Sequence, residues 1–322
     1  MSIRVVQVGF GSVGQRRAAL VAADPRAVLV GVCEPDAAGR ASAREQYGSD
    51  LLVSETLEPL LVGDVDAVIV STPNATHIPL SVQAVEAGAH VLCEKPLAGS
   101  LAEARPLVEA VAVRKRLFKM GANHQTFPSV LAALEQVRSG ELGPLQRVRI
   151  ALGHSRFEAL PHWFRDPAQA GGGTLLDNGS HAALLALTLL DDAGQKPLRV
   201  SCELERRQGI DVAAQAQIIG DAGLPISLES SWVREGGYCF ELQIVGRDGT
   251  LEVHNPGALS LNGVALEVVE RPSWGLDTQD FLDAIAEQRA PAVDLGMALR
   301  CLALLESCYE SAANGREVHW TR

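Results

Sequence analysis

The sequence lacks the features of membrane and secreted proteins. No apolar run reaches the roughly 18 residues that a membrane-spanning helix needs, because a charged residue interrupts each run first. The opening residues, MSIRVVQVGFG, contain no basic stretch followed by an apolar signal core and a small-residue cleavage site. We therefore expect a cytoplasmic protein that does not bind a membrane.

The sequence contains neither the basic pattern typical of nucleic-acid binding nor the cysteine pattern typical of metal binding. Lys and Arg form no long basic block and the formal net charge is -11, so nucleic acid is not expected as a partner. The six cysteines lie scattered, most of them in apolar segments, without a CxxC pair or a closely spaced His/Cys set. They are expected to be buried free thiols, and no metal site is predicted.

Strand-like and helix-like segments are arranged in two different ways along the chain. Its 322 residues suit two domains of about 100–200 residues each. Residues 1–122 alternate nearly all-apolar strands with helices, which predicts a doubly wound parallel sheet (a Rossmann domain). Residues 123–322 contain successive strands with short Gly/Asp/Asn turns and closing helices near 278–288 and 295–313, which predicts an α+β domain with a mainly antiparallel sheet. The predicted fold class is α/β.

The segment GFGSVG lies at the junction of the first predicted strand and helix. Its glycines would permit a tight turn, the approach of a pyrophosphate to the backbone, and close helix–strand packing. Glu34 ends the second predicted strand and could accept hydrogen bonds from both adenosine ribose hydroxyls, which favours NAD, while nearby Arg40 leaves NADP open. A purely structural turn would also fit this motif. The predicted cofactor contacts here are Gly9, Phe10, Gly11, Ser12, Val13, Gly14 and Glu34.

Two further loops, STPNATH and CEKPL, follow predicted strands of the same sheet. Open parallel sheets bind ligands outside the carboxyl ends of their strands, so both loops should line the nicotinamide half of a cleft. Their prolines are also consistent with ordinary turns, whereas a desolvated lysine at a strand end could handle a proton. The predicted contacts are Ser71, Thr72, Pro73, Asn74, His77, Glu94, Lys95 and Pro96.

The stretch AGGGTLLDNGSHAALL contains a second candidate for proton transfer. Asp177 and His181 are four residues apart, so they share one face if the helix has begun by Asp177. A carboxylate beside an imidazole orients it and stabilises its charged form, which suits an acid/base pair. Asp177, Asn178 or Ser180 could instead cap the helix that follows.

Taken together, these motifs resemble those of the Gfo/Idh/MocA (glucose-fructose oxidoreductase / inositol dehydrogenase) family. The resemblance rests on GFGSVG, STPNATH, the EKP of residues 94–96, GGGTLLDNGSH and the closing SAANGREV, and it runs through almost the entire chain. It implies an N-terminal Rossmann domain and a C-terminal domain on a large open sheet whose exposed face commonly forms dimers and tetramers. It also implies hydride exchange between NAD(P) and a secondary alcohol, with Lys95, Asp177 and His181 as catalytic residues.

One position departs from the family pattern. Many members carry an arginine in the segment that reads GANHQTFP here, and Gln125 stands in its place, which puts in doubt a substrate with an anionic group at that point. His124 beside it could contact substrate or form structural hydrogen bonds. The predicted substrate contacts are Asn123, Arg156 and Trp163, the last of which could equally be a packing residue.

Three functions remain open at this point. The first is an NAD(P)-dependent dehydrogenase or reductase of a sugar or cyclitol, forming a homodimer or homotetramer. The second is a ketoreductase for a nucleotide-linked sugar in polysaccharide or secondary-metabolite biosynthesis. The third is a non-catalytic NAD-binding sensor, against which the joint presence of Lys95, Asp177 and His181 argues.

Overall fold

The computed structural model describes residues 2–255 and 257–320, and the chain divides into two compact units. One contains the residues up to Ala122 together with Trp274–Leu299, and the other contains Asn123–Ser273 together with the residues from Arg300 onward. Among the described residues, no helix is long and apolar enough to cross a membrane. The six cysteines are free and buried, as predicted.

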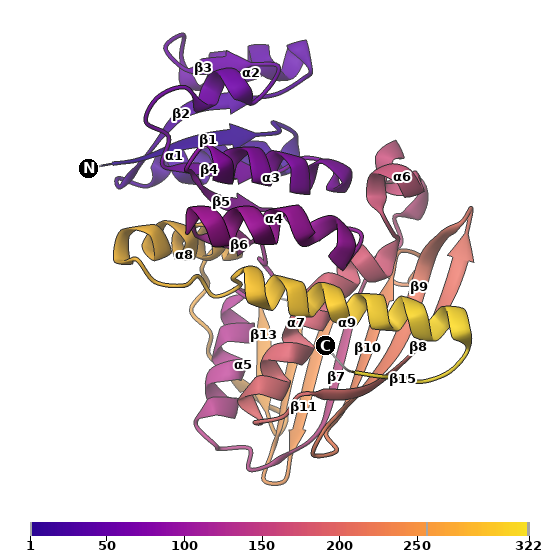
Figure 1. Cartoon of the computed structure of the whole chain (residues 1–322). Helices are drawn as coiled ribbons and strands as arrows, with labels where there is room; N and C mark the ends of the chain where they lie inside the picture. Colours follow the sequence, from indigo (N-terminus) through magenta and orange to yellow (C-terminus); the bar gives the residue numbers. More distant parts are fainter. Residues whose placement is uncertain (1, 256, 321–322) are drawn as a thin grey trace. The chain divides into compact units, whose positions relative to one another are not determined.

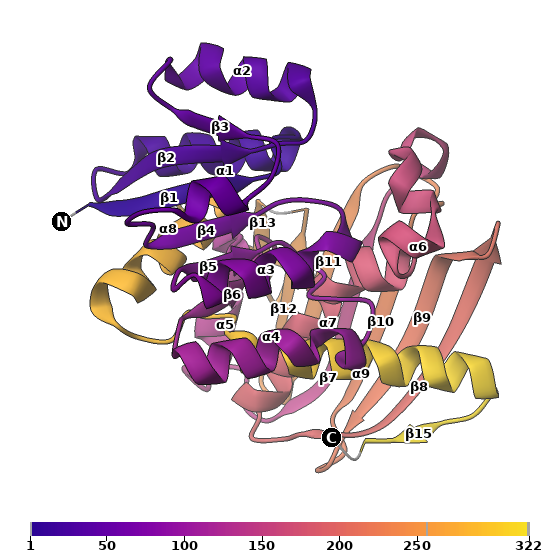
Figure 2. The same cartoon turned by 45° about the horizontal axis from the view of Figure 1, so that its top comes forward.

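The first unit is built on a parallel sheet of six strands in the order β3-β2-β1-β4-β5-β6 (Figure 1). Strand order reverses between β1 and β4, and open parallel sheets bind ligands at such a switch point. One edge of the sheet is β3, with α2 beside it (Figure 2). The strands are β1 (Ile3–Val8), β2 (Ala27–Cys33), β3 (Leu52–Ser54), β4 (Ala67–Val70), β5 (His90–Cys93) and β6 (Phe118–Met120).

Helices follow the strands of this sheet in the predicted alternation. Strand β4 is buried along its whole length, as expected for a parallel sheet with helices on both faces. The helices are α1 (Ser12–Ala23), α2 (Ala37–Tyr47), η1 (Glu58–Leu61), η2 (Asn74–Thr76), α3 (His77–Glu86), α4 (Leu101–Arg114) and α8 (Ser273–Glu287).

Helix α8 departs from the predicted division of the chain, which assigned all of residues 123–322 to the second domain. Its residues Phe281 and Leu282 are buried in one hydrophobic cluster with Val5, Ile69 and Leu92 of the parallel sheet. The helix therefore completes the core of the first unit although it comes some 150 residues later in the chain.

The second unit is built on a sheet of nine strands in the order β14-β13-β12-β11-β7-β10-β9-β8-β15. The β7–β10 pair is parallel and the other described pairs of this sheet are antiparallel, so the prediction of a large, mainly antiparallel sheet is confirmed. Its strands are β7 (Leu145–Gly153), β8 (Pro197–Arg207), β9 (Ile210–Gly220), β10 (Pro225–Ser231), β11 (Cys239–Gly246), β12 (Thr250–His254), β13 (Ala258–Leu261), β14 (Val264–Leu266) and β15 (Val318–His319).

One helix covers the middle of this sheet. Helix α7 (Thr174–Asp192) packs on β7, β9 and β10 (Figure 1). Strand β10 accordingly alternates buried and half-buried residues, because only one of its faces meets the helix. The other helices of the second half of the chain are α5 (Pro128–Arg138), η3 (Phe157–Ala159), η4 (His162–Arg165), α6 (Pro167–Ala170) and α9 (Leu295–Asn314).

Candidate active site

The glycine-rich loop connects β1 directly to the N-terminus of α1. Gly9 has a φ of 81° and a side chain there would meet the carbonyl oxygen of Ser71, while a Cβ at Gly14 would lie 2.0 Å from the Gly9 oxygen. These two glycines are therefore required by close backbone approach. A Cβ at Gly11, by contrast, would meet no heavy atom of the described residues within 4 Å.

Helix α1 begins at Ser12, and no side chain of the described residues caps it, nor is there an acidic residue in its first turn. Its free first-turn N–H groups and the open space at Gly11 fit the pyrophosphate of a dinucleotide. The Phe10 ring does not point toward such a ligand, because it is buried in a cluster with Ala18 and Val32. The backbone of Phe10 is also bound within the loop, because its N–H donates to Glu34 and its carbonyl oxygen accepts from Gln15 Nε2 at 3.0 Å.

Glu34, directly after β2, reaches back to the glycine-rich loop. Its Oε2 accepts a hydrogen bond from the Phe10 N–H at 2.6 Å, and its Oε1 accepts one from the Asp36 N–H at 2.9 Å. Arg40 Nη1 donates to the carbonyl oxygens of Glu34 and Pro35 at 2.8 and 2.6 Å. The carboxylate is thus fixed beside the loop, while the guanidinium is bound to the backbone.

The two loops that should line the nicotinamide are joined by His77. This buried imidazole has its Nε2 2.9 Å from the Thr72 carbonyl oxygen and its Nδ1 2.8 Å from the Pro96 carbonyl oxygen. Burial lowers the pKa of His77, while its contacts with the two carbonyl oxygens act in the opposite direction. Lys95 is half-buried in the second loop, before a cis peptide bond to Pro96.

Glu94 belongs to a buried network of charges. Its Oε1 accepts hydrogen bonds from Arg17 Nε and Nη2 at 2.9 and 2.7 Å, and Arg17 Nη2 also lies 2.6 Å from Asp277 Oδ2. Lys119 Nζ lies 3.1 Å from Asp277 Oδ1 and 2.9 Å from Asp280 Oδ2. The Glu94 carboxylate, predicted to contact the cofactor, therefore binds the buried Arg17. This ion pair fixes the position of the residue before Lys95.

In the second unit, α7 starts at Thr174, so Asp177 and His181 lie one turn apart on the same face. The helix has already begun before Asp177, Asn178 and Ser180, so none of these suggested residues caps it. Asp211 on β9 does so instead, because its Oδ1 accepts from the Gly173 N–H at 2.9 Å and its Oδ2 from the Leu175 N–H at 2.8 Å. Ser180 donates its hydroxyl to the Leu176 carbonyl oxygen.

Two of the three glycines before α7, Gly172 and Gly173, allow the start of the helix to approach α9 and the sheet. A Cβ at Gly173 would lie 2.0 Å from the Asp211 carbonyl oxygen, and one at Gly172 would lie 2.6 Å from the Tyr309 hydroxyl oxygen. The Tyr309 hydroxyl donates to Asp211 Oδ1 at 3.0 Å. Packing within the second unit therefore accounts for Gly172 and Gly173.

Asp177 and His181 each have an aromatic neighbour from elsewhere in the chain. Trp232 Nε1 donates to Asp177 Oδ2 at 2.9 Å. The rings of His124 and His181 have centroids 3.8 Å apart and planes inclined by 36°, and the His124 ring also packs edge-on against Phe127. His181 is buried, with 2% of its surface exposed. The sequence reasoning left His124 undecided and missed Trp232.

The predicted substrate residues have different surroundings. Asn123 is buried and its carbonyl oxygen accepts from the Thr126 hydroxyl at 3.0 Å. Arg156 is exposed, whereas Trp163 is half-buried with its ring centroid 3.9 Å from that of Phe164. Gln125 points its Nε2 toward the Thr188 hydroxyl of α7 at 3.5 Å.

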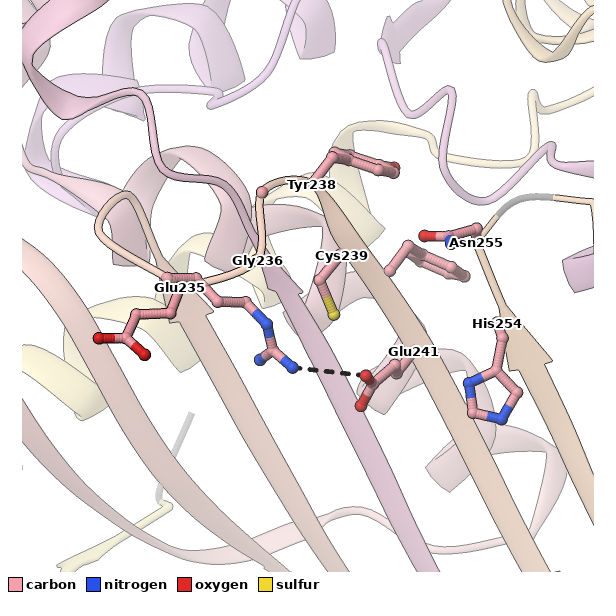
Figure 3. A pocket seen from close by; sticks show the side chains of 10 residues that line it. Glu235, Gly236, Tyr238, Cys239, Glu241, His254 and Asn255 are labelled. Atoms are coloured by element: carbon pink, nitrogen blue, oxygen red, sulfur yellow. Dashed lines mark hydrogen bonds and ion pairs between the residues drawn. The ribbon is translucent and has the colours of Figure 1, made fainter.

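A pocket of about 220 Å³ lies at the start of β11, between the β10–β11 loop and the end of β12 (Figure 3). In it Arg234 Nη2 lies 3.4 Å from Glu241 Oε1, and Tyr238 points away from this pair. None of the sequence-predicted site residues lines the pocket. It is a separate, mainly polar hollow on the second unit.

Comparison with known proteins gives matches to two family models. Residues 3–122 match the model of the GFO/IDH/MocA oxidoreductase family with an NAD-binding Rossmann fold. Residues 130–252 match the model of the GFO/IDH/MocA C-terminal domain. The first match confirms the predicted NAD-binding Rossmann domain.

Individual relatives are similar over nearly the whole chain. Inositol 2-dehydrogenase of Rhizobium meliloti is 25% identical, with 99% of each chain covered. The scyllo-inositol 2-dehydrogenase (NAD(+)) of Bacillus subtilis is 24% identical, with 90% of this chain and 88% of the relative covered.

Solved structures with the same fold over nearly the whole chain are also found. The crystal structure of GenD2 from gentamicin A biosynthesis, in complex with NAD, superposes with a TM-score of 0.88 at 27% identity and covers 100% of this chain and 97% of the other. That of the aldose-aldose oxidoreductase from Caulobacter crescentus superposes with a TM-score of 0.89 at 24% identity, covering 99% and 100%.

Proposed function

Because this chain belongs to the GFO/IDH/MocA family of NAD-binding oxidoreductases, we propose that it transfers hydride between NAD and the secondary-alcohol carbon of a sugar or cyclitol. The observation that carries the proposal is the Asp177–His181 pair on one face of α7, with Asp177 held by Trp232. The similarity over 99% of both chains to a protein named inositol 2-dehydrogenase supports the same substrate class.

The first unit would hold the cofactor. The N-terminus of α1 and the open space at Gly11 suit the pyrophosphate, and the Glu34 carboxylate suits the hydroxyls of the adenosine ribose. The loops after β4 and β5, linked by His77, would lie beside the nicotinamide. Bound NAD supplies the acceptor for the hydride.

His181 would act as the acid/base. In the oxidation, its imidazole takes the proton of the substrate hydroxyl while hydride leaves the same carbon, and in the reduction it returns that proton to the carbonyl oxygen. Asp177, one turn earlier, orients the imidazole and stabilises its charged form. Lys95 donates a hydrogen bond to the substrate hydroxyl or relays its proton.

A substrate panel tests this proposal directly. Formation of NADH is followed with inositols, aldoses, glucosides and an aminoglycoside, each at saturating NAD, and turnover with a cyclitol or sugar is expected. NAD binding measured by calorimetry without turnover of any panel member, and without reduction of the corresponding ketones by NADH, would instead identify a non-catalytic NAD-binding protein.

A second candidate is an oxidoreductase of secondary-metabolite biosynthesis. Its basis is the 27% identity to GenD2 from gentamicin A biosynthesis over the full chain, a value that similarity to inositol 2-dehydrogenases also reaches. In the panel, a higher kcat/KM for the aminoglycoside than for free inositols would select this candidate. The proposed roles of Lys95, Asp177 and His181 are the same in both cases.

Replacement of Glu34 is expected to change the cofactor preference. In Glu34→Ala the ribose hydroxyls lose an acceptor and a 2′-phosphate no longer meets a carboxylate, so the NADP/NAD ratio of kcat/KM should rise roughly ten-fold or more. The control is Asp36→Ala, which removes a nearby carboxylate that caps α2 through the Gly39 N–H. Equal ratios in the two variants and the unmodified enzyme would count against the ribose-binding role.

A further inference from the structure

Trp232, the residue after β10, is fixed on every side within the second unit. Its side chain is fully buried in a hydrophobic cluster with Phe157, Ile210 and Val212. Its N–H donates to the Val212 carbonyl oxygen at 2.8 Å, and its own carbonyl oxygen accepts from the N–H groups of Arg156 and Phe157 at 3.1 and 3.2 Å. Both the backbone and the ring are therefore held in one position.

The polar atom of this side chain lies at the edge of the apolar cluster. An indole N–H can only donate and a carboxylate can only accept, so the 2.9 Å bond from Trp232 Nε1 to Asp177 Oδ2 has one possible direction. A buried N–H without an acceptor is costly, whereas a phenylalanine would fill an apolar cluster with no such demand. Any aromatic ring would fill the cluster, whereas the hydrogen bond to the Asp177 carboxylate requires the indole N–H.

The same residue also supports the segment that follows β7. Its carbonyl oxygen binds the backbone at Arg156 and Phe157, and its ring packs against the rings of Phe157 and Phe164, with centroids 6.4 and 6.0 Å apart. The predicted substrate residues Arg156 and Trp163 belong to this segment. Trp232 is thus in contact with both the helix that carries Asp177 and the segment proposed to contact substrate.

We propose that Trp232 is a positioning residue of the reaction, whose indole N–H fixes the orientation of the Asp177 carboxylate one helical turn before His181. This inference rests on the proposed catalytic role of Asp177. A carboxylate with one oxygen held by a rigid donor cannot rotate freely about its last side-chain bond. Asp177 is then already oriented before substrate arrives, which is what a group that aligns an acid/base requires.

The test removes the N–H and keeps the ring. In Trp232→Phe, kcat for the best panel substrate is expected to fall roughly ten-fold to a hundred-fold, because a hydrogen bond to a charged group is lost. The KM for NAD should not change, because the cofactor loops of the first unit are untouched. Benzothienylalanine introduced at position 232, which has the shape of tryptophan but sulfur in place of the N–H, should show the same fall in kcat even if Trp232→Phe folds poorly.

Two controls separate positioning from packing. Ile210→Ala weakens the same hydrophobic cluster from β9 without removing the indole bond, so its melting temperature should fall while kcat stays close to that of the unmodified enzyme. Benzothienylalanine at Trp320, after β15, controls for incorporation of the analogue. Normal kcat in the position-232 analogue, or equal kcat in Trp232→Phe and Ile210→Ala, would overturn the inference.

Asp177→Ala, measured alongside, distinguishes this inference from the proposed function. If Asp177→Ala retains full turnover, the catalytic role of Asp177 is wrong and the inference fails with it. If Asp177→Ala loses turnover and both position-232 variants keep it, the proposed function stands and only the inference fails. Loss of kcat in all three variants is the expected result.

Discussion

His181→Ala is expected to lower kcat by roughly a hundred-fold to ten-thousand-fold, the usual contribution of a positioned acid/base. The hydroxyl proton then has no acceptor on α7 as hydride leaves the substrate carbon. The affinity for NAD should stay the same, because the predicted cofactor contacts all lie in the first unit. Initial rates of NADH formation and calorimetric binding of NAD measure the two quantities.

Because His181 is buried against His124, the alanine variant also loses packing. His181→Gln keeps most of the side-chain volume and should lose turnover to a similar degree while retaining a melting temperature close to that of the unmodified enzyme. His319→Ala, on strand β15, serves as the control histidine and should retain turnover. Intact turnover in both His181 variants would show that another group handles the proton.

Local sequence patterns were sufficient for the fold class and for the tight turn of the glycine-rich loop. Three glycines within six residues, placed between a buried strand and a helix, predict the tight turn, and the approach of Gly14 to the Gly9 oxygen lies within that turn. The four-residue spacing of Asp177 and His181 likewise predicts a common helix face once the helix is assigned. Both patterns depend on residues close together in the chain.

The contacts that hold these groups could not be predicted in the same way. The carboxylate that caps α7 is 38 residues away from Gly173, and the indole that binds Asp177 is 55 residues away from it. A buried Asp or Trp in a strand gives no local signal of its partner, because the pairing depends on how β9 and β10 pack under α7. The roles of Asp211, Tyr309 and Trp232 therefore needed the tertiary structure.

Helix α8 shows that the domain to which a helix belongs is also not predictable from local sequence patterns. Its sequence predicts an amphipathic helix but not the sheet on which it packs, and a boundary drawn at one point of the chain cannot represent a unit made of two segments. The buried bond from Arg17 to Asp277 joins residues 260 positions apart. That bond is the basis of the second large effect that we expect.

Asp277→Ala is expected to lower the free energy of unfolding of the first unit by about 3–5 kcal/mol, the usual cost of breaking a buried ion pair. The guanidinium of Arg17 and the ammonium of Lys119 are fully buried, and Asp277 lies 2.6 and 3.1 Å from them. Without it, two buried positive charges lose a common partner. Urea denaturation followed by far-UV circular dichroism measures the change.

The matched control is Asp283→Ala on the same helix. Asp283 pairs with Arg26, but both side chains are partly exposed, with 24% and 39% of their surface accessible. Exposed pairs contribute about 0–1 kcal/mol, so this variant should unfold at nearly the same urea concentration as the unmodified protein. Equal destabilisation by the two substitutions would mean that loss of a helix side chain, and not of a buried charge, is responsible.

The pH dependence of stability gives an independent measure of the same network. Burial alone would raise the pKa of Asp277, but the positive charges of Lys119 and Arg17 lower it below its usual value near 4. Its folded pKa is thus below the unfolded one, so its stabilising contribution is present above about pH 4 and is lost as pH falls through the folded pKa. Asp277→Ala should therefore lose stability less steeply than the unmodified protein when the pH is lowered below about 4. Parallel stability curves for the two proteins would show that Asp277 does not titrate at a lowered pKa.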